Sequence, residues 1–281
     1  MTLNGRPGLP QAFFLPTPTG QRFCLFHPPQ GEQCRGRVLY LHPFAEELNT
    51  TRRVAAKQAR ALALAGFAVL QIDLLGCGDS EGELAQATWE AWLQDAQHAC
   101  DWLSDHAQGA LWVWAMRGGS LLATTLAAQL AQTPHLLLWQ PVINGQQMLQ
   151  QFLRLHAAGQ WLGDGSKGDA PAKTLASGQL VNIAGYTLTP ALASGLGAAR
   201  MKAVSAATPG RLVWLETSPQ PEPTLGPASN THLDGWRAAG WLVTAQAVGG
   251  PAFWQTVGTD TAPALMAATM QALTTYGDTT A

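Results

Sequence analysis

Charged residues are scarce in this sequence. Only 12% of its 281 residues are charged, and 16 Lys and Arg side chains stand against 18 Asp and Glu, which gives a formal net charge of −2. A nucleic-acid-binding surface needs a clustered excess of basic side chains, so the sequence excludes this class of protein. An apolar content of 47% is enough to build a hydrophobic core and excludes a disordered chain.

Paired cysteines, long apolar runs and targeting segments are missing as well. The four cysteines form neither a CxxC pair nor a zinc-ligand spacing, so we expect reduced thiols, no metal and no cofactor. No apolar run approaches the ~20 residues of a membrane span. Residues 1–19 lack the charged and apolar regions of a signal peptide. These absences predict a cytoplasmic protein without a membrane span.

Short apolar runs alternate with amphipathic segments from residue 37 onward. Buried strands are predicted at residues 38–41, 67–74, 110–114, 136–139, 211–215 and 241–248. Helices are predicted at residues 50–66, 89–105, 118–132, 229–239 and 262–276. This alternation is typical of parallel βαβ units, in which ligands bind at the carboxyl ends of the strands.

The alternation is interrupted after Pro141. Residues 146–162 predict a helix, residues 163–172 form a Gly- and Asp-rich loop, and residues 174–207 mix short extended pieces with turns. We therefore expect an α/β fold whose core is formed by residues 1–144 and 208–281. A small lid is expected as an insertion at residues 145–207.

A nucleophile is missing from the turn that normally holds one. A strand followed by a tight turn of small residues and a helix is the geometry of the nucleophile elbow, GxSxG. Here the strand ending near Trp114 continues into the sequence AMRGGS, which places Arg117 at the nucleophile position. Arginine has no lone pair for attack on a carbonyl. Ser120 lies in the first turn of the next helix and is expected to point away from the elbow tip.

The usual partners of a catalytic serine are incomplete too. Glu216, at a strand end, and Glu222, in the loop that follows, each offer a carboxylate. The loop after the last strand reads GGPAFW and contains no histidine, and His232 falls on a predicted helix. Without an imidazole at this position, we expect no classical Ser-His-acid proton relay.

Several motifs resemble those of a known superfamily. The segments HPFAEELNTTRR (42–53), DLLGCGDS (73–80) and WQP (139–141) are similar to the α/β-hydrolase superfamily. HPFAEELNTTRR resembles more narrowly the exosortase A system-associated hydrolase 2 proteins of bacteria, and QFLR (151–154), AGYTL (184–188) and FWQT (253–256) fit that group. The resemblance implies an α/β-hydrolase fold, a hydrolase, and a link to protein sorting and envelope or exopolysaccharide functions. It also implies that an arginine at the elbow is a feature of the group.

Polar residues are concentrated at the strand ends of the predicted sheet. His42, Glu46 and Glu47 follow the first parallel strand, Asp73 follows the next and Arg117 the third, so we expect them at one pocket. Arg117 has the geometry to bind a ligand carboxylate, phosphate or polarised carbonyl. The structural alternative is that Glu46 or Glu47 neutralises Arg117 and fixes the loop to the elbow. The two roles can coexist.

The candidate site residues follow from this grouping. The candidates for catalysis are Arg117, Glu46, Glu47 and His42. The candidates for ligand binding are Arg117, His42, Phe44, Glu46, Glu47, Asp73 and Trp254. His42 has the chemistry of a general base, but nothing in the sequence supplies an orienting partner, which favours a structural role. Arg52 and Arg53, predicted at a helix start, indicate a carboxylate partner such as Glu46 or Glu47.

Two functions are compatible with these residues. The first is hydrolysis of an ester, thioester or similar acyl substrate, with Arg117 as an electrostatic stabiliser and an activated water or substrate group in place of serine. The second is a non-catalytic descendant that binds an acyl or anionic ligand, or a partner protein, through the same pocket. The sequence does not determine the oligomeric state.

Overall fold

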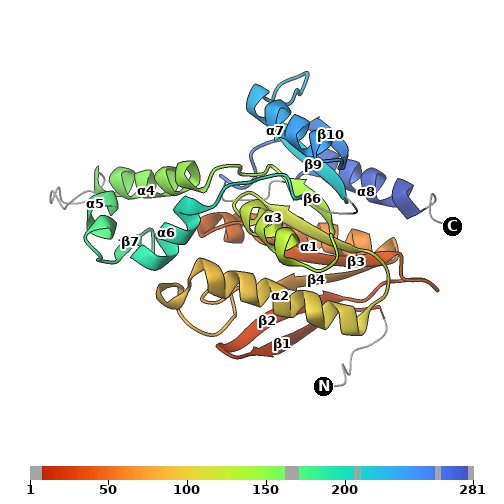
Figure 1. The fold of residues 1–281 in the computed structure, drawn as a ribbon, viewed down its shortest axis with the longest axis horizontal. Helices are drawn as coiled ribbons and strands as arrows, with labels where there is room; N and C mark the ends of the chain where they lie inside the picture. The colour runs from red at the N-terminus through yellow and green to blue at the C-terminus, as the bar shows by residue number, and fades with distance from the viewer. Residues whose placement is uncertain (1–7, 162–170, 206–207, 209, 257–260, 278–281) are drawn as a thin grey trace.

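An eight-stranded sheet forms the centre of the computed structural model, which describes residues 8–161, 171–205, 208, 210–256 and 261–277 (Figure 1). The strand order is β1-β2-β4-β3-β5-β6-β9-β10. The strands are β1 (Gln11–Thr17), β2 (Gly20–His27), β3 (Gly36–Leu41), β4 (Phe67–Ile72), β5 (Leu111–Met116), β6 (His135–Trp139), β9 (Arg211–Ser218) and β10 (Leu242–Gly249). β2 pairs antiparallel with β1 and β4, and the pairs from β4 to β10 are parallel.

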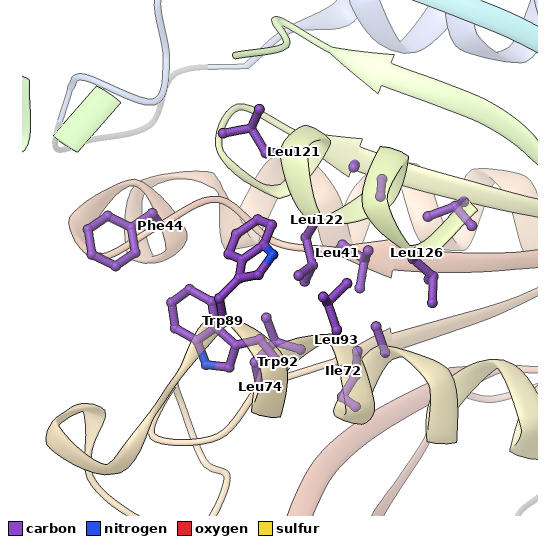
Figure 2. Close-up of a cluster of buried hydrophobic side chains, with 14 of the residues drawn as sticks. Leu41, Phe44, Ile72, Leu74, Trp89, Trp92, Leu93, Leu121, Leu122 and Leu126 are labelled. Atoms are coloured by element: carbon purple, nitrogen blue, oxygen red, sulfur yellow. The ribbon is translucent and has the colours of Figure 1, made fainter. Parts of the chain in front are cut away.

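Helices cover both faces of the sheet, which explains why its central parallel strands, β3, β4, β5 and β6, are mainly apolar. The helices are α1 (Glu46–Leu64), α2 (Trp89–His106), α3 (Gly119–Gln129), α7 (Pro227–Ala238) and α8 (Pro263–Gly277). Alternate strand residues contribute to two cores: Val38 and Tyr40 pack on the side of α1 and α8, and Leu39 and Leu41 on the side of α2 and α3. Figure 2 shows Leu41 in this second core, close to Leu122.

The chain leaves the sheet between β6 and β9. This inserted segment contains α4 (Gly145–Trp161), α5 (Pro171–Ala176), β7 (Val181–Ile183), β8 (Tyr186–Leu188) and α6 (Pro190–Ala198). Figure 1 shows these elements together on one side of the molecule. The β7–β8 hairpin is held to α1 by Asn49, whose Nδ2 donates a 3.1 Å hydrogen bond to the hydroxyl of Tyr186.

The mostly parallel sheet flanked by helices confirms the predicted fold class. The predicted elements of the core are present with bounds shifted by a few residues, and the largest shift is at α1, which begins at Glu46 instead of residue 50. Arg52 and Arg53 therefore lie in the second turn of α1, so their predicted position at a helix start is wrong. None of the helices in the described residues is long and apolar enough to cross a membrane.

Two features of the fold differ from the prediction. The β1–β2 hairpin was not predicted. The expectation of extended pieces and turns within residues 174–207 is wrong at α6, which is a helix. Its glycines serve helix packing instead of turns: a Cβ on Gly195 would lie 2.4 Å from the Cβ of Trp89 in α2. The first part of the predicted loop, residues 163–170, lies outside the described residues.

Candidate functional site

Arg117 occupies the sharp turn between β5 and α3. Its φ angle is 52°, a left-handed conformation that is uncommon for any residue other than glycine. The turn is held by the Arg117 N–H, which donates to the carbonyl of Trp139, and by the N–H of Ser120, which donates to the carbonyl of Arg117. Gly119 permits the close approach of the next loop, because a Cβ there would lie 2.6 Å from the carbonyl oxygen of Leu41. The turn therefore presents the Arg117 side chain at the carboxyl end of β5.

The Arg117 guanidinium is fixed by a carboxylate and an indole ring. Its Nε donates a 3.0 Å hydrogen bond to Oε1 of Glu47, and the two side chains are only 16% and 17% exposed. Its Cζ lies 5.2 Å from the ring centroid of Trp254, a cation–π distance. Glu47, and not Glu46, is thus the carboxylate that pairs with Arg117. Among the described residues, the two Nη groups have no hydrogen-bond partner.

The two adjacent glutamates follow a strained loop. Ala45, which precedes them, has a φ angle of 52°. Burial raises the pKa of Glu47, while the positive charge of Arg117 acts in the opposite direction. Burial also raises the pKa of Glu46, whose Oε2 is buried without a hydrogen-bond partner in the described part of the chain. Glu47 is therefore part of an ion pair, whereas Glu46 has no ion-pair partner among the described residues.

A cavity of about 460 Å³ adjoins these side chains. It is lined by Phe44, Glu46, Glu47, Thr50, Arg117, Met148, Gln151, Phe152, Trp254 and Gln255. The inserted segment forms one wall, since Met148, Gln151 and Phe152 all belong to α4. The rings of Phe44 and Phe152 pack edge to face with centroids 4.9 Å apart. The cavity thus combines an apolar wall with one guanidinium and two carboxyl groups.

Comparisons with known proteins agree with the fold described above. The family model described as serine aminopeptidase, S33, matches residues 32–167. Est1E from Butyrivibrio proteoclasticus, solved with ferulic acid, superimposes with a TM-score of 0.62 at 14% identity, covering 94% of this chain and 97% of that one. A soluble variant of monoglyceride lipase from Saccharomyces cerevisiae gives a TM-score of 0.61 at 12% identity, covering 99% and 97%. This chain has the α/β-hydrolase fold. No curated protein matches its sequence.

In the α/β-hydrolase fold, the turn after this strand normally presents a nucleophile, and here it presents Arg117. Ser120 lies in the first turn of α3, fully buried, and its Oγ has no hydrogen-bond partner among the described residues. Ser120 does not line the cavity above Arg117. Its placement agrees with the expectation that Ser120 points away from the elbow tip.

A carboxylate, Glu216, occupies the acid position of the α/β-hydrolase fold, but its Oε1 is already hydrogen-bonded. Oε1 of Glu216, at the end of β9, accepts hydrogen bonds from Nε1 of Trp214 at 2.7 Å and from Oγ of Ser229. This carboxylate therefore ties β9 to α7. Glu222 is exposed in the next loop, and His232 lies on α7. The loop after β10, described as far as residue 256, supplies Trp254 to the cavity instead of a histidine.

His42 lies in the loop after β3, and its buried side chain contacts main-chain groups. Its Nδ1 lies 2.7 Å from the carbonyl oxygen of Pro43, and its Nε2 accepts a 3.3 Å hydrogen bond from the N–H of Leu74. Burial lowers the pKa of His42, which favours the neutral ring. Both ring nitrogens are thus engaged by main-chain groups, and His42 does not line the cavity above Arg117.

Asp73 lies apart from Arg117 and organises the loop after β4. Its Oδ2 accepts a 2.8 Å hydrogen bond from Nη2 of Arg52 and a 3.0 Å bond from the N–H of Asp79. Asp73, and neither Glu46 nor Glu47, is therefore the carboxylate partner of Arg52, which corrects the expectation from the sequence. Asp73 and His42 line a different cavity from the one that Arg117, Glu46 and Glu47 line.

Sequence reasoning missed the wall contributed by α4. Met148, Gln151 and Phe152 share one helix face, and their i, i+3, i+4 spacing is the signal that would have grouped them. Their position over the elbow depends on Gly118, where a Cβ would lie 2.6 Å from Sδ of Met148. Such a close approach between distant segments has no local signature in the sequence.

Proposed function

We propose that this protein hydrolyses an ester, thioester or similar acyl substrate in the cavity above Arg117, without a Ser-His-acid triad. The strained backbone of Arg117 carries the proposal. A non-glycine residue in this conformation costs about 1–3 kcal/mol, and such strain persists where it presents a group to a functional site. The elbow conformation is retained, and it presents a guanidinium to a cavity.

Arg117 stabilises negative charge in the proposed reaction. Glu47 holds Nε and fixes the plane of the guanidinium, which leaves the two Nη groups to donate to the substrate carbonyl oxygen. Glu46 lines the same cavity, and burial moves its pKa towards neutral pH, where a general base is most effective. Glu46 accepts a proton from water as the water oxygen attacks the carbonyl carbon. The acyl bond then breaks, and the proton passes to the leaving group.

The apolar side chains hold the acyl group in this scheme. Phe44 and Trp254 contact the substrate, and the inserted segment at residues 145–207 acts as a lid over it. His42 and Asp73 support the surrounding loops, because their polar atoms already bond protein groups. The monoglyceride lipase and the ferulic acid-bound Est1E among the similar structures support an acyl substrate. The resemblance of residues 42–53 to exosortase A system-associated hydrolase 2 proteins supports a role in that bacterial system.

A non-catalytic binding function is the second candidate. It is favoured by the Arg117–Glu47 ion pair, which satisfies both charges without a ligand, and by the burial of Ser120. In this case the same cavity holds an acyl or anionic ligand, or a side chain of a partner protein, without turnover.

Turnover of p-nitrophenyl esters with acyl chains from acetyl to decanoyl tests the two candidates. We expect wild-type activity, a loss of about 10²-fold or more in Glu46→Gln and in Arg117→Ala, and no change in Ser120→Ala. Glu90→Gln, an exposed site on α2, is the matched control for a lost carboxylate. Labelling of a serine by a fluorophosphonate would contradict the proposal. If the wild type binds the acyl ligand through Arg117 but does not turn it over, the second candidate holds.

A further inference from the structure

A second cavity lies between α1 and the strands β2, β3 and β4. Its volume is about 170 Å³, and it shares no lining residue with the cavity above Arg117. Its lining consists of Phe23, Leu25, Tyr40, His42, Leu48, Arg52, Ala55, Ala56, Gln71, Ile72 and Asp73. The reaction proposed above uses none of these side chains to contact its substrate.

The walls of this second cavity are mainly apolar. Phe23 and Leu25 of β2 are half-buried and form one side, and α1 offers Ala55 and Ala56 on the other. These small residues keep the space open where a larger aliphatic side chain would fill it. The apolar surface continues onto β1, where Phe14 is 46% exposed with its ring 5.8 Å from that of Phe23.

Most polar groups around the second cavity already have partners within the protein. The side chain of Gln71 lies 3.0 Å from Nε2 of His27. His42 is engaged by main-chain groups at both ring nitrogens. These groups therefore require nothing from a ligand.

Arg52 is the exception. Its Nη2 bonds Asp73, and within the described residues its remaining N–H groups have no hydrogen-bond partner. Its side chain is 42% exposed at the mouth of the cavity. Asp73 fixes the guanidinium in position, and the remaining N–H groups present a donor fork that matches a carboxylate. One charged donor group thus stands beside an apolar space.

We propose that the second cavity binds a short aliphatic monocarboxylate, with its tail between α1 and β2 and its carboxylate on Arg52. The size of the ligand follows from the volume, since apolar cavities of about 150 Å³ bind molecules as large as benzene. A chain of about six carbons therefore fits. A dicarboxylate does not fit, because the inner part of the cavity offers no second cation among its lining residues.

Sodium hexanoate is the probe, with hexan-1-ol as the analogue that lacks the carboxylate. Isothermal titration calorimetry is expected to show hexanoate binding to the wild type, with an affinity about tenfold lower in Arg52→Gln. Ala56→Trp fills the mouth and is expected to abolish binding of both probes. Arg53→Gln changes the neighbouring cation, which does not line the cavity, and is expected to leave both affinities unchanged. In NMR spectra of the wild type, hexanoate shifts the amide signals of Ala55 and Ala56.

Three results would overturn this proposal. The first is the absence of hexanoate binding to the wild type. The second is equal hexanoate affinity in the wild type, Arg52→Gln and Ala56→Trp, each shown to be folded by thermal melting. The third is binding that Arg117→Ala abolishes, which would assign hexanoate to the elbow cavity. If Ala56→Trp does not fold, Arg52→Gln and the NMR shifts decide, and neither depends on esterase activity.

Discussion

Replacement of Arg117 by alanine is expected to destabilise the protein by an amount that depends on pH. Arg117→Ala keeps the Cβ, so the backbone strain at this position is the same in both proteins and cancels. What changes is Glu47, whose side chain is 17% exposed and loses its 3.0 Å partner. A mostly buried polar group left without a partner costs about 1–3 kcal/mol. Because the pair is not fully buried, we expect about 2 kcal/mol at pH 8.

The pH dependence follows from the titration of Glu47. Burial raises its folded-state pKa and Arg117 opposes this, so removal of Arg117 lets the pKa rise further above its value in the unfolded chain. Below the unfolded pKa, about 4.3, the carboxyl group is neutral in both states and the penalty is absent. Because the unfolded pKa is the same in both proteins, the penalty grows as pH rises from the folded pKa of Glu47 in the wild type to its higher value in the variant, and it is complete above the latter.

Urea unfolding at pH 5 and pH 8, followed by tryptophan fluorescence, measures this effect. We expect the free-energy penalty of Arg117→Ala to be larger at pH 8. In a thermal melt at that pH, a loss of about 2 kcal/mol corresponds to a Tm lower by roughly 4–8 °C. The double variant Arg117→Ala/Glu47→Gln is the control, because it has no carboxylate to titrate and is expected to lose the pH dependence. An Arg117→Ala protein as stable as the wild type at pH 8, or equally destabilised at both pH values, would refute the reasoning.

Three further substitutions have defined outcomes. Ser120→Ala removes a buried hydroxyl without a partner among the described residues, so urea midpoints are expected to stay within about 0.5 kcal/mol of wild type or to rise. Gly119→Ala places a Cβ 2.6 Å from the carbonyl oxygen of Leu41, and loss of soluble folded protein on expression is the expected readout. Gly78→Ala places a Cβ against the carboxylate of Asp73 at a φ angle of 55°, and we expect a loss of more than about 2 kcal/mol in the same assay.

The central parallel strands, β3, β4, β5 and β6, were predictable because they are buried on both faces. Continuous apolar runs such as residues 136–139 alternate along the chain with amphipathic helical segments, and this pattern indicates buried parallel strands. The β1–β2 hairpin has no such signature. Its buried Arg22 is tolerated because Nε donates a 2.8 Å hydrogen bond to Asp95 of α2, a partner 73 residues away in the sequence. Local patterns do not contain that pairing.

The site was predictable to a similar extent. The rule that strand ends meet at one edge of the sheet grouped Arg117 with Glu46 and Glu47. In the structure, these three residues line one cavity. The rule does not say which carboxylate pairs with which cation, because this depends on side-chain reach. Arg52 accordingly bonds Asp73 instead of either glutamate. The position of α4 was not predictable, since Gly145 approaches Leu196 too closely for any Cβ.

The hydrogen bonds of Glu216 bear on whether the usual chemistry of this fold can be recovered by evolution. Introducing serine at position 117 would restore the shape of a nucleophile elbow, but the carboxylate expected to orient the base already bonds Trp214 and Ser229. The loop after β10 would need a histidine where Trp254 now stacks on the guanidinium. A serine at position 117, a free Glu216 carboxylate and a histidine after β10 form a triad only when all three are present. The last two changes also remove contacts that Glu216 and Trp254 make now. Serine chemistry at position 117 would therefore require coordinated changes at the elbow, around Glu216 and in the loop after β10.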